Sequence, residues 1–216
     1  MVKDWMSSAP ITIDVKASLS EALATMERHH ISLLPVLEND KLSGIVTDMD
    51  MKPFKTLCCS CSAAGGFAVI LDRVRVEDVM SRTPVTIPSD YTMEEVADVL
   101  LKNEAYGVLV VDGNNQLVGV VTQRDINRVF ISLTGLRKGG IAFGFLLEDS
   151  PGSIKDVTDI LRSHGARIQS ILTSYERTVK GYRNVQIRVR KLNRASLPQV
   201  LQELREKGRQ IGRAHV

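Results

Sequence analysis

Hydrophobic and polar positions recur in nearly the same order over residues 4–50 and 78–125, with a single one-residue insertion. Each copy reads as a short strand, a helix, two strands joined by a polar turn, and a second helix. The period is too long for a solenoid and occurs only twice, so it predicts a tandem pair of domains with the order β-α-β-β-α. One such unit is too small to bury itself well, and we expect the two to pack together.

The first helix of each copy has a defined start and an apolar face. It begins at Ser18-x-x-Glu21 in the first copy and at Thr92-x-x-Glu95 in the second, and both are capping boxes. The expected buried face is formed by Leu19, Ala22, Leu23 and Met26 in the first copy and by Val96, Ala97, Leu100 and Leu101 in the second.

Each copy ends on a shared motif, Gly-x-x-Thr-x-x-Asp, over residues 44–50 and 119–125. Its Thr-x-x-Asp part lies where the last strand meets the second helix. Thr at the N-cap with Asp three residues later is close to a capping box, which needs no ligand. A carboxylate also suits the cis-diol of a ribose, because it offers acceptors only, and a helix N-terminus favours phosphate. Both roles can hold at once, and the motif alone does not choose between them.

The two motifs are not equivalent. Arg124 precedes Asp125 and can pair with phosphate, whereas Met49 occupies that position in the first copy. Pro53 is expected to cut the second helix of the first copy short. We therefore expect the second motif to hold a phosphorylated ligand, and the first to hold an uncharged nucleoside end or nothing.

From residue 139 the pattern changes and predicts a separate domain with the order β-α-β-β-α-β, the split βαβ or ferredoxin-like arrangement. In the turn before its first helix, Ser150 is a candidate N-cap and Pro151 the first helical residue. The expected strands cover residues 141–147, 168–175, 182–189 and 211–216, and the two helices have apolar faces around residues 154–161 and 197–204.

Composition is that of an ordinary globular protein, with 44% hydrophobic, 25% charged and 5% aromatic residues. No apolar run approaches the roughly 20 residues that a membrane span needs. The N-terminal residues carry acid and lack a long apolar stretch, which argues against a signal peptide. We expect a cytoplasmic protein that does not contact the membrane.

Charge is distributed unevenly. Residues 139–216 hold 14 Lys and Arg against 7 Asp and Glu, whereas residues 1–138 hold 14 against 18. In the basic part, Arg188 and Arg190 alternate with Ile187 and Val189, as on the outward face of a half-buried strand. The excess is explained either by a solvated basic face or by an anionic partner such as nucleic acid.

Only three cysteines occur, Cys58, Cys59 and Cys61. The Cys58-x-x-Cys61 spacing suits a metal, but a structural zinc site needs four ligands and no second pair follows. We therefore expect ordinary thiols and no metal. The chain also has no nucleophile, metalloprotease or nucleotide-hydrolase signature, so we expect a protein that is not an enzyme.

The repeated motif and its surroundings resemble CBS domains, and the tandem copies resemble a Bateman module. On this basis residues 1–57 form the first CBS domain, 58–75 a connector and 76–134 the second CBS domain. Residues 139–216 resemble an ACT domain through the strand and helix order and the turn at 149–152. The combination is similar to CBS–ACT proteins that include acetoin-utilisation accessory proteins, and the implied fold class is α+β.

This resemblance implies a regulatory adenosyl ligand (AMP, ADP, ATP or S-adenosylmethionine) between the paired CBS domains, with no required cofactor. Asp50 and Asp125 would accept hydrogen bonds from ribose hydroxyls, and Thr47 and Thr122 would contact phosphate, the latter with Arg124. The implied adenine neighbours are Thr12, Ile13, Thr86 and Ile87. The implied amino-acid site of the ACT turn consists of Asp149, Ser150, Pro151 and Gly152.

The expected function is therefore a non-enzymatic ligand sensor. The resemblance implies a homodimer formed through the CBS and ACT domains, and a regulated partner that the sequence does not identify. One alternative is a nucleic-acid-binding or transcriptional accessory protein that uses the basic C-terminal domain. Another is an interaction scaffold whose clefts are empty.

Overall fold

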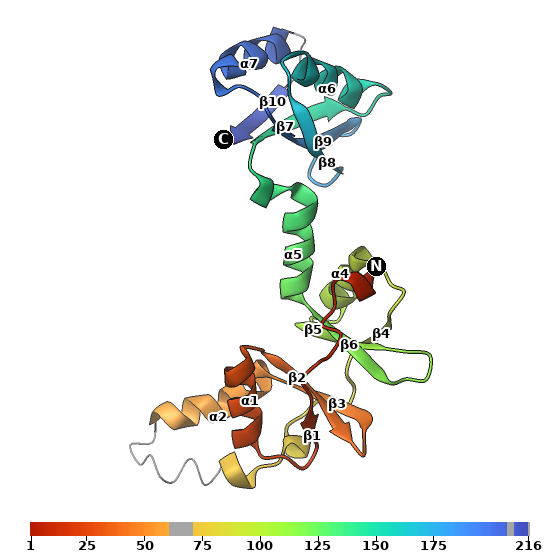
Figure 1. The fold of residues 1–216 in the computed structure, drawn as a ribbon, viewed down its shortest axis with the longest axis vertical. Coiled ribbons are helices and arrows are strands. Elements are labelled where there is room, and N and C mark those ends of the chain that lie inside the picture. Colours follow the sequence, from red (N-terminus) through yellow and green to blue (C-terminus); the bar gives the residue numbers. More distant parts are fainter. Residues whose placement is uncertain (61–70, 207–209, 216) are drawn as a thin grey trace. The chain divides into compact units, whose positions relative to one another are not determined.

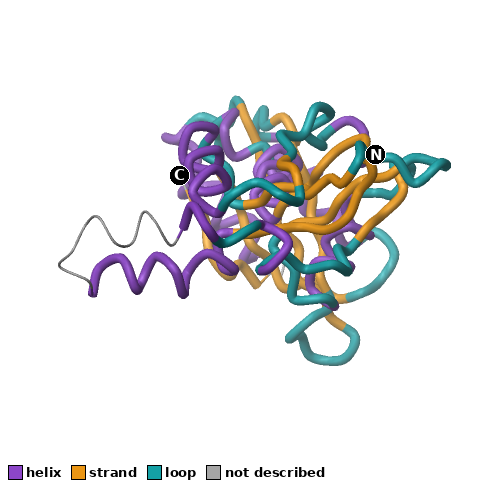
Figure 2. Tube along the Cα trace, turned by 90° about the horizontal axis from the view of Figure 1, so that it is seen from below, coloured by secondary structure: helices purple, strands orange, loops and turns teal. Residues whose placement is uncertain are grey.

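The computed structural model describes residues 1–60, 71–206 and 210–215 (Figure 1). The chain divides into two compact units, Met1–Asn127 and Arg128–Val216. Helices and strands both occur throughout (Figure 2), which agrees with the expected α+β class.

The N-terminal unit contains two three-stranded sheets of the same design. In each sheet the first strand runs parallel to the second, which pairs with the third in an antiparallel hairpin. The first repeat contains β1 (Ile13–Asp14), α1 (Leu19–His29), β2 (Leu33–Glu38), β3 (Lys41–Thr47) and α2 (Asp48–Ser60). The second contains β4 (Thr86–Pro88), α4 (Met93–Lys102), β5 (Gly107–Val111) and β6 (Leu117–Thr122), and it ends in α5 (Gln123–Thr134), which continues beyond Asn127 into the second unit. This order confirms the predicted β-α-β-β-α repeat.

Both predicted capping boxes are present. A Glu21 carboxylate oxygen accepts the Ser18 N–H at 2.8 Å, and Glu95 does the same for Thr92 at 2.7 Å. Most of the predicted buried faces are confirmed, but Leu23 and Ala97 are only partly buried and Leu101 is 77% exposed. The buried positions of α4 are spaced three and four residues apart, at Met93, Val96 and Leu100. Leu101 lies one residue, or about 100°, beyond that face.

Helix α2 is longer than expected, since it continues through Pro53 to Ser60. The expectation that Pro53 would cut this helix short is therefore wrong. A proline has no N–H for the carbonyl four residues earlier, here that of Met49. Met49 itself is 43% exposed, so water can replace the missing donor. The helix therefore loses one hydrogen bond without ending.

The two repeats are joined because the segment that precedes each one crosses the last sheet strand of the other. Ser81 exchanges hydrogen bonds with Ile45 of β3 at 2.9 and 3.0 Å, and Ser7 does so with Val120 of β6 at 3.0 and 3.2 Å. Between the sheets an apolar cluster is formed by Leu33, Ile45, Leu109 and Val120. The repeats therefore pack as a pair, as their small size led us to expect.

The C-terminal unit has one four-stranded sheet with the order β10-β7-β9-β8, in which all neighbours are antiparallel. This is the predicted split βαβ arrangement. Phe143, Leu161, Ile187 and Leu204 are fully buried in its core. The elements are β7 (Ile141–Glu148), α6 (Ser153–Ser163), β8 (Arg167–Ser174), β9 (Tyr182–Arg190), α7 (Leu197–Glu206) and β10 (Gln210–His215).

Helix α6 begins later than predicted. Gly152 is its N-cap, so Ser150 does not cap the helix and Pro151 is not its first residue. These residues instead form a type II β-turn, in which the Ser153 N–H donates to the Ser150 carbonyl at 3.3 Å. Gly152, with φ of 90°, occupies the position of that turn that favours glycine. The Pro-Gly pair therefore selects a turn and delays the helix.

Candidate functional site

Both Thr-x-x-Asp motifs form the same closed arrangement where a strand passes into a helix. The Asp50 Oδ2 atom accepts the Thr47 N–H and the Thr47 hydroxyl, each at 2.7 Å. The Asp125 Oδ2 atom accepts the Thr122 N–H at 3.0 Å and its hydroxyl at 2.7 Å. Each aspartate therefore caps its helix as a capping-box carboxylate does.

This arrangement limits what the threonines can offer a ligand. A hydroxyl has one hydrogen, and in both motifs that hydrogen is donated to the aspartate. Phosphate oxygens act as acceptors and need donors. As the side chains lie, Thr47 and Thr122 would have to break the bond to the carboxylate before donating to phosphate. Their predicted role in phosphate contact therefore requires a rearrangement.

The first helical N–H groups are also occupied. Asp48 donates its N–H to the Ser32 carbonyl at 2.9 Å, and Gln123 donates to the Tyr106 carbonyl at 3.0 Å. The next N–H groups, those of Met49 and Arg124, are the nearest candidate donors to an anion. These are the positions at which the two motifs differ in charge, so backbone and side chain would act together on phosphate only in the second motif.

Burial also distinguishes the two motifs. Asp125 is only 7% exposed, whereas Asp50 is half-buried. The adjacent Arg124 side chain is exposed, as is Met49. The second motif therefore combines an enclosed carboxylate with a cation that can reach a ligand from the surface.

The predicted adenine neighbours lie on the first strand of each sheet, which the middle strand separates from the strand that ends in the motif. Thr47, at the end of β3, pairs with Leu33 at the start of β2, and β1 runs parallel to β2 from Ile13. The second repeat has the same register. Ile13 is 9% exposed and Ile87 is 3% exposed, so their side chains belong to the cores of their repeats. Only the backbone there, with Thr12 and Thr86, remains available to flank a base.

The predicted amino-acid turn has a cationic neighbour that sequence reasoning missed. Arg183 of β9 lies 3.4 Å from the Asp149 carboxylate and donates to the Ser153 hydroxyl at 3.0 Å. Its Nε atom is buried without a hydrogen-bond partner among the described residues. The Tyr175 hydroxyl also reaches Asp149, at 3.4 Å. Arg183 arrives through strand pairing with Leu147, a register that the sequence pattern did not reveal.

The basic strand β9 alternates as predicted, with Ile187 and Val189 buried. Arg188 is only partly exposed, and its Nε donates to the Thr134 carbonyl at 2.9 Å. This contact gives Arg188 a structural role, whereas Arg190 remains exposed.

The described residues were also searched for metal sites and membrane-spanning helices. Within residues 1–60, 71–206 and 210–215, no group of three His, Cys, Asp or Glu side chains could hold a metal ion. Cys61 and most of the predicted connector at 58–75 lie outside the described residues, and the expectation of ordinary thiols stays a prediction. No helix of the described part is long and apolar enough to cross a membrane.

Comparison with known proteins supports the repeat. The family model described as CBS domain matches residues 2–52 and 76–132, together half of the chain. L-aspartate semialdehyde sulfurtransferase of Methanocaldococcus jannaschii is 33% identical over 131 residues, 60% of this chain but only 23% of that enzyme. A CBS domain-containing protein of Dictyostelium discoideum is 30% identical over 62% of this chain and 92% of its own length.

One solved structure adds a ligand. The CBS domain pair of protein MJ0100, in complex with 5′-methylthioadenosine and S-adenosyl-L-methionine, is 32% identical with a TM-score of 0.51. The match covers 61% of this chain and 96% of that one. A protein with this arrangement therefore holds adenosyl ligands.

Proposed function

Because the chain belongs to the CBS-domain family, we propose that it is a non-enzymatic regulator that binds an adenosyl ligand at its paired Thr-x-x-Asp motifs. The observation that carries this proposal is the geometry of Asp50 and Asp125. Each carboxylate is held at a helix start beside the strand ends where a nucleoside would lie. A carboxylate has about four lone-pair sites, so a capping role does not exhaust it. The adenosyl ligands in the related CBS pair support this reading.

The two motifs would prefer adenosyl ligands with different substituents. Arg124 and its N–H form a pair of donors suited to phosphate, so the second motif would favour AMP, ADP or ATP. Met49 would favour an uncharged or sulfur-containing substituent, as in 5′-methylthioadenosine or S-adenosylmethionine. The exposed thioether of Met49 can pack against such a group.

Calorimetric titration of the full chain with AMP, ADP, ATP, S-adenosylmethionine and 5′-methylthioadenosine tests the proposal. Asp125→Asn keeps an acceptor for the Thr122 N–H but removes the charge. It should weaken binding at the second motif about tenfold or more. Asp50→Asn should do the same at the first motif. If none of the five compounds binds the wild-type chain, the proposal fails.

Glu95→Gln is the matched control, because Glu95 also caps a helix through a backbone N–H but lies at the opposite end of its sheet. It should leave every affinity unchanged. Arg124→Met converts the second motif to the pattern of the first. It should weaken AMP and leave 5′-methylthioadenosine unaffected, because only AMP carries phosphate. Equal weakening of both ligands would contradict a phosphate contact by Arg124.

For the C-terminal unit we propose an ACT-like amino-acid site at the turn from Asp149 to Gly152. Asp149 and Arg183 place opposite charges 3.4 Å apart, an arrangement that complements the ammonium and carboxylate groups of an amino acid. Titration with the standard amino acids tests this, with Asp149→Asn expected to abolish binding. Glu176→Gln, an exposed acid on the same unit, should not change it. Binding that survives Asp149→Asn would contradict the site.

We further propose that the chain acts as a homodimer and transmits ligand binding to a partner protein. A ligand that prefers one arrangement of the paired repeats shifts the population toward it, and a partner that recognises the same arrangement is thereby coupled to the ligand. Sedimentation equilibrium with and without ligand measures the oligomeric state. A monomer under both conditions would contradict the dimer.

A further inference from the structure

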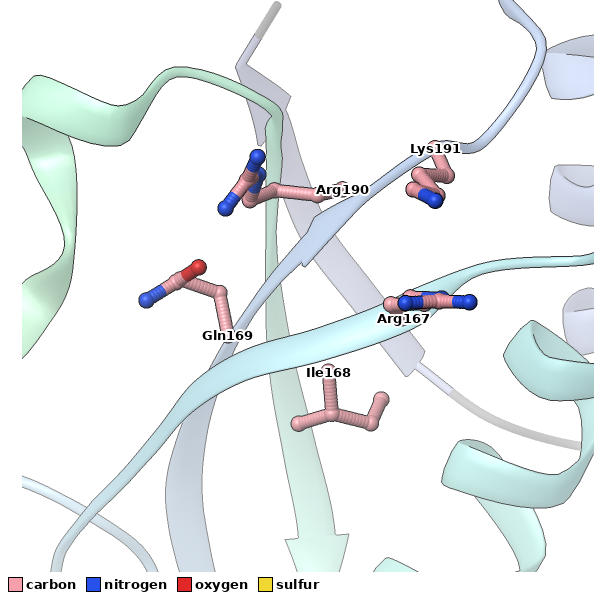
Figure 3. Close-up of a pocket in the computed structure, with 5 residues that line it drawn as sticks. All are labelled: Arg167, Ile168, Gln169, Arg190 and Lys191. Atoms are coloured by element: carbon pink, nitrogen blue, oxygen red, sulfur yellow. The ribbon is translucent and has the colours of Figure 1, made fainter.

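Three cationic side chains gather at one edge of the C-terminal sheet, around a cavity of about 250 Å³ (Figure 3). Arg167 begins β8, Arg190 ends β9, and Lys191 follows it. Ile168 and Gln169 complete the lining. These five residues are called the basic pocket. Figure 3 shows the Lys191 side chain extending toward Arg167, while Arg190 and Gln169 project to the other side.

Nothing in the described part of the chain neutralises this charge. Arg167 and Arg190 are paired on neighbouring antiparallel strands, and their side chains extend to different sides in Figure 3. All three cationic side chains are exposed, and none forms an ion pair with a described residue. A bound anion would therefore neutralise positive charge that no described side chain offsets.

The backbone adds an unfavourable feature at the same place. Lys191 has φ of 63°, in the left-handed region that non-glycine residues rarely adopt. A glycine would be less costly there, yet the position carries a cation aimed at Arg167. An unfavourable backbone conformation therefore coincides with the cluster of three cationic side chains.

The basic pocket is separate from the turn at Asp149. Along the β7–β9 pair, Glu148 faces Tyr182 at one end and Ile141 faces Val189 at the other. Arg190 follows Val189, so the pocket lies at the end of the sheet opposite to the turn. A ligand here would therefore not occupy the proposed amino-acid site.

We propose that the basic pocket binds a phosphate group, either free phosphate or the phosphate of a small organic molecule. Arg167 and Lys191 are the direct contacts, and Arg190 adds to the positive potential. A guanidinium offers a planar pair of donors that matches two phosphate oxygens, and an ammonium adds a point charge. The cavity is slightly smaller than the roughly 300–1,000 Å³ of pockets for drug-sized ligands, which favours a compact anion.

The compact geometry argues for a small molecule over nucleic acid. A nucleic-acid groove needs cations that follow successive phosphates along a backbone. Here the neighbouring cation Arg188 is tied to the Thr134 carbonyl and does not extend the cluster. The charge is concentrated around one cavity.

The test is titration of the isotopically labelled full chain with inorganic phosphate and with glycerol 3-phosphate, followed by the backbone amide signals of Arg167 and Lys191. Both signals should shift in a saturable way. Lys191→Gly removes the cation and suits the backbone, so it should fold normally and weaken binding about tenfold. Arg167→Gln should have a similar effect, and Arg190→Gln a smaller one.

Arg177→Gly is the matched control, because Arg177 is also exposed, has φ of 56° and lies at the far end of the β8–β9 hairpin. It removes the same charge and should leave phosphate binding unchanged. Tighter binding of glycerol 3-phosphate than of phosphate identifies an organic ligand, and equal binding identifies the free anion.

Unshifted signals in the wild-type chain would overturn the proposal, as would equal losses in Lys191→Gly and Arg177→Gly. Tighter, strongly salt-dependent binding of a single-stranded oligonucleotide at the same signals would overturn the small-molecule reading. Asp125→Asn should not affect these signals. The outcome is therefore independent of the adenosyl proposal.

Discussion

The glycine that opens each Gly-x-x-Thr-x-x-Asp motif is required by the packing of the two repeats. A Cβ atom at Gly44 would lie 2.6 Å from the Ser81 carbonyl oxygen and 2.9 Å from the Met80 sulfur. At Gly119 it would lie 2.5 Å from the Met6 sulfur and 3.2 Å from the Ser7 carbonyl oxygen. Each glycine therefore lets the segment that precedes the other repeat cross its strand.

These contacts predict an order of stability among three alanine substitutions. Gly44→Ala should be the most destabilising, by about 1–3 kcal/mol, because a backbone atom must move. Gly119→Ala should cost less, because its closest neighbour is the flexible end of Met6. Urea unfolding followed by circular dichroism measures the free energy of unfolding.

Gly113→Ala is the control, because no atom lies within 4 Å of its added Cβ. It should change the free energy of unfolding by no more than about 0.5 kcal/mol. If Gly44→Ala were as mild as Gly113→Ala, the crossing at Ser81 would not exist as described.

At the scale of elements, α2 shows how a helix tolerates a proline. Pro53 is exposed and lies in the second turn, while Met51 on the same helix is fully buried. Packing of the helix against the first repeat thus outweighs the local preference to end it. The same balance explains why the Pro53 expectation was wrong and the capping boxes were right, since a box is satisfied within its own four residues.

Pro53→Ala should therefore stabilise the chain. It restores a donor for the Met49 carbonyl and removes a residue that costs about 3 kcal/mol in a helix interior. We expect a gain of about 1–3 kcal/mol in the free energy of unfolding by urea titration. A loss of stability would show that the proline supports the start of α2 by fixing its backbone.

At the scale of the whole molecule, the two compact units lead us to expect two unfolding transitions by differential scanning calorimetry. An adenosyl ligand bound to the paired repeats should raise the melting temperature of one transition and leave the other in place. The shift grows with ligand concentration, since only the folded state binds. A single transition that moves as a whole would contradict separate units.

A substitution in the core of one unit shows which unfolding transition belongs to that unit. Leu161 is fully buried in the C-terminal core, so Leu161→Ala should destabilise that unit by about 2–5 kcal/mol. The transition that it lowers should be the one that the adenosyl ligand leaves unchanged. If both perturbations moved the same transition, the ligand would not bind to the N-terminal unit.

Much of the fold was predictable because its signals are local or periodic. The capping boxes at Ser18 and Thr92, the strands expected at 168–175 and 182–189, and the alternation along β9 are all confirmed. The errors arose where a residue's role depended on distant partners or on competing local preferences. Leu101 was misplaced by one helical step, and Ser150 with Pro151 formed a turn where a helix start was expected.

By itself, the sequence determined the duplication, the order of strands and helices in each part, and the two carboxylates that are the candidate ligand contacts. Hydrophobic period and four-residue caps carry that information, because they involve neighbours along the chain. The tertiary structure alone decided which donors are already occupied, that Ile13 and Ile87 face the core, and that Arg183 meets Asp149. Strand register and packing control these contacts. Both depend on residues that are far apart in the sequence. It was also strand pairing that placed Arg167 opposite Arg190 and so created the basic pocket.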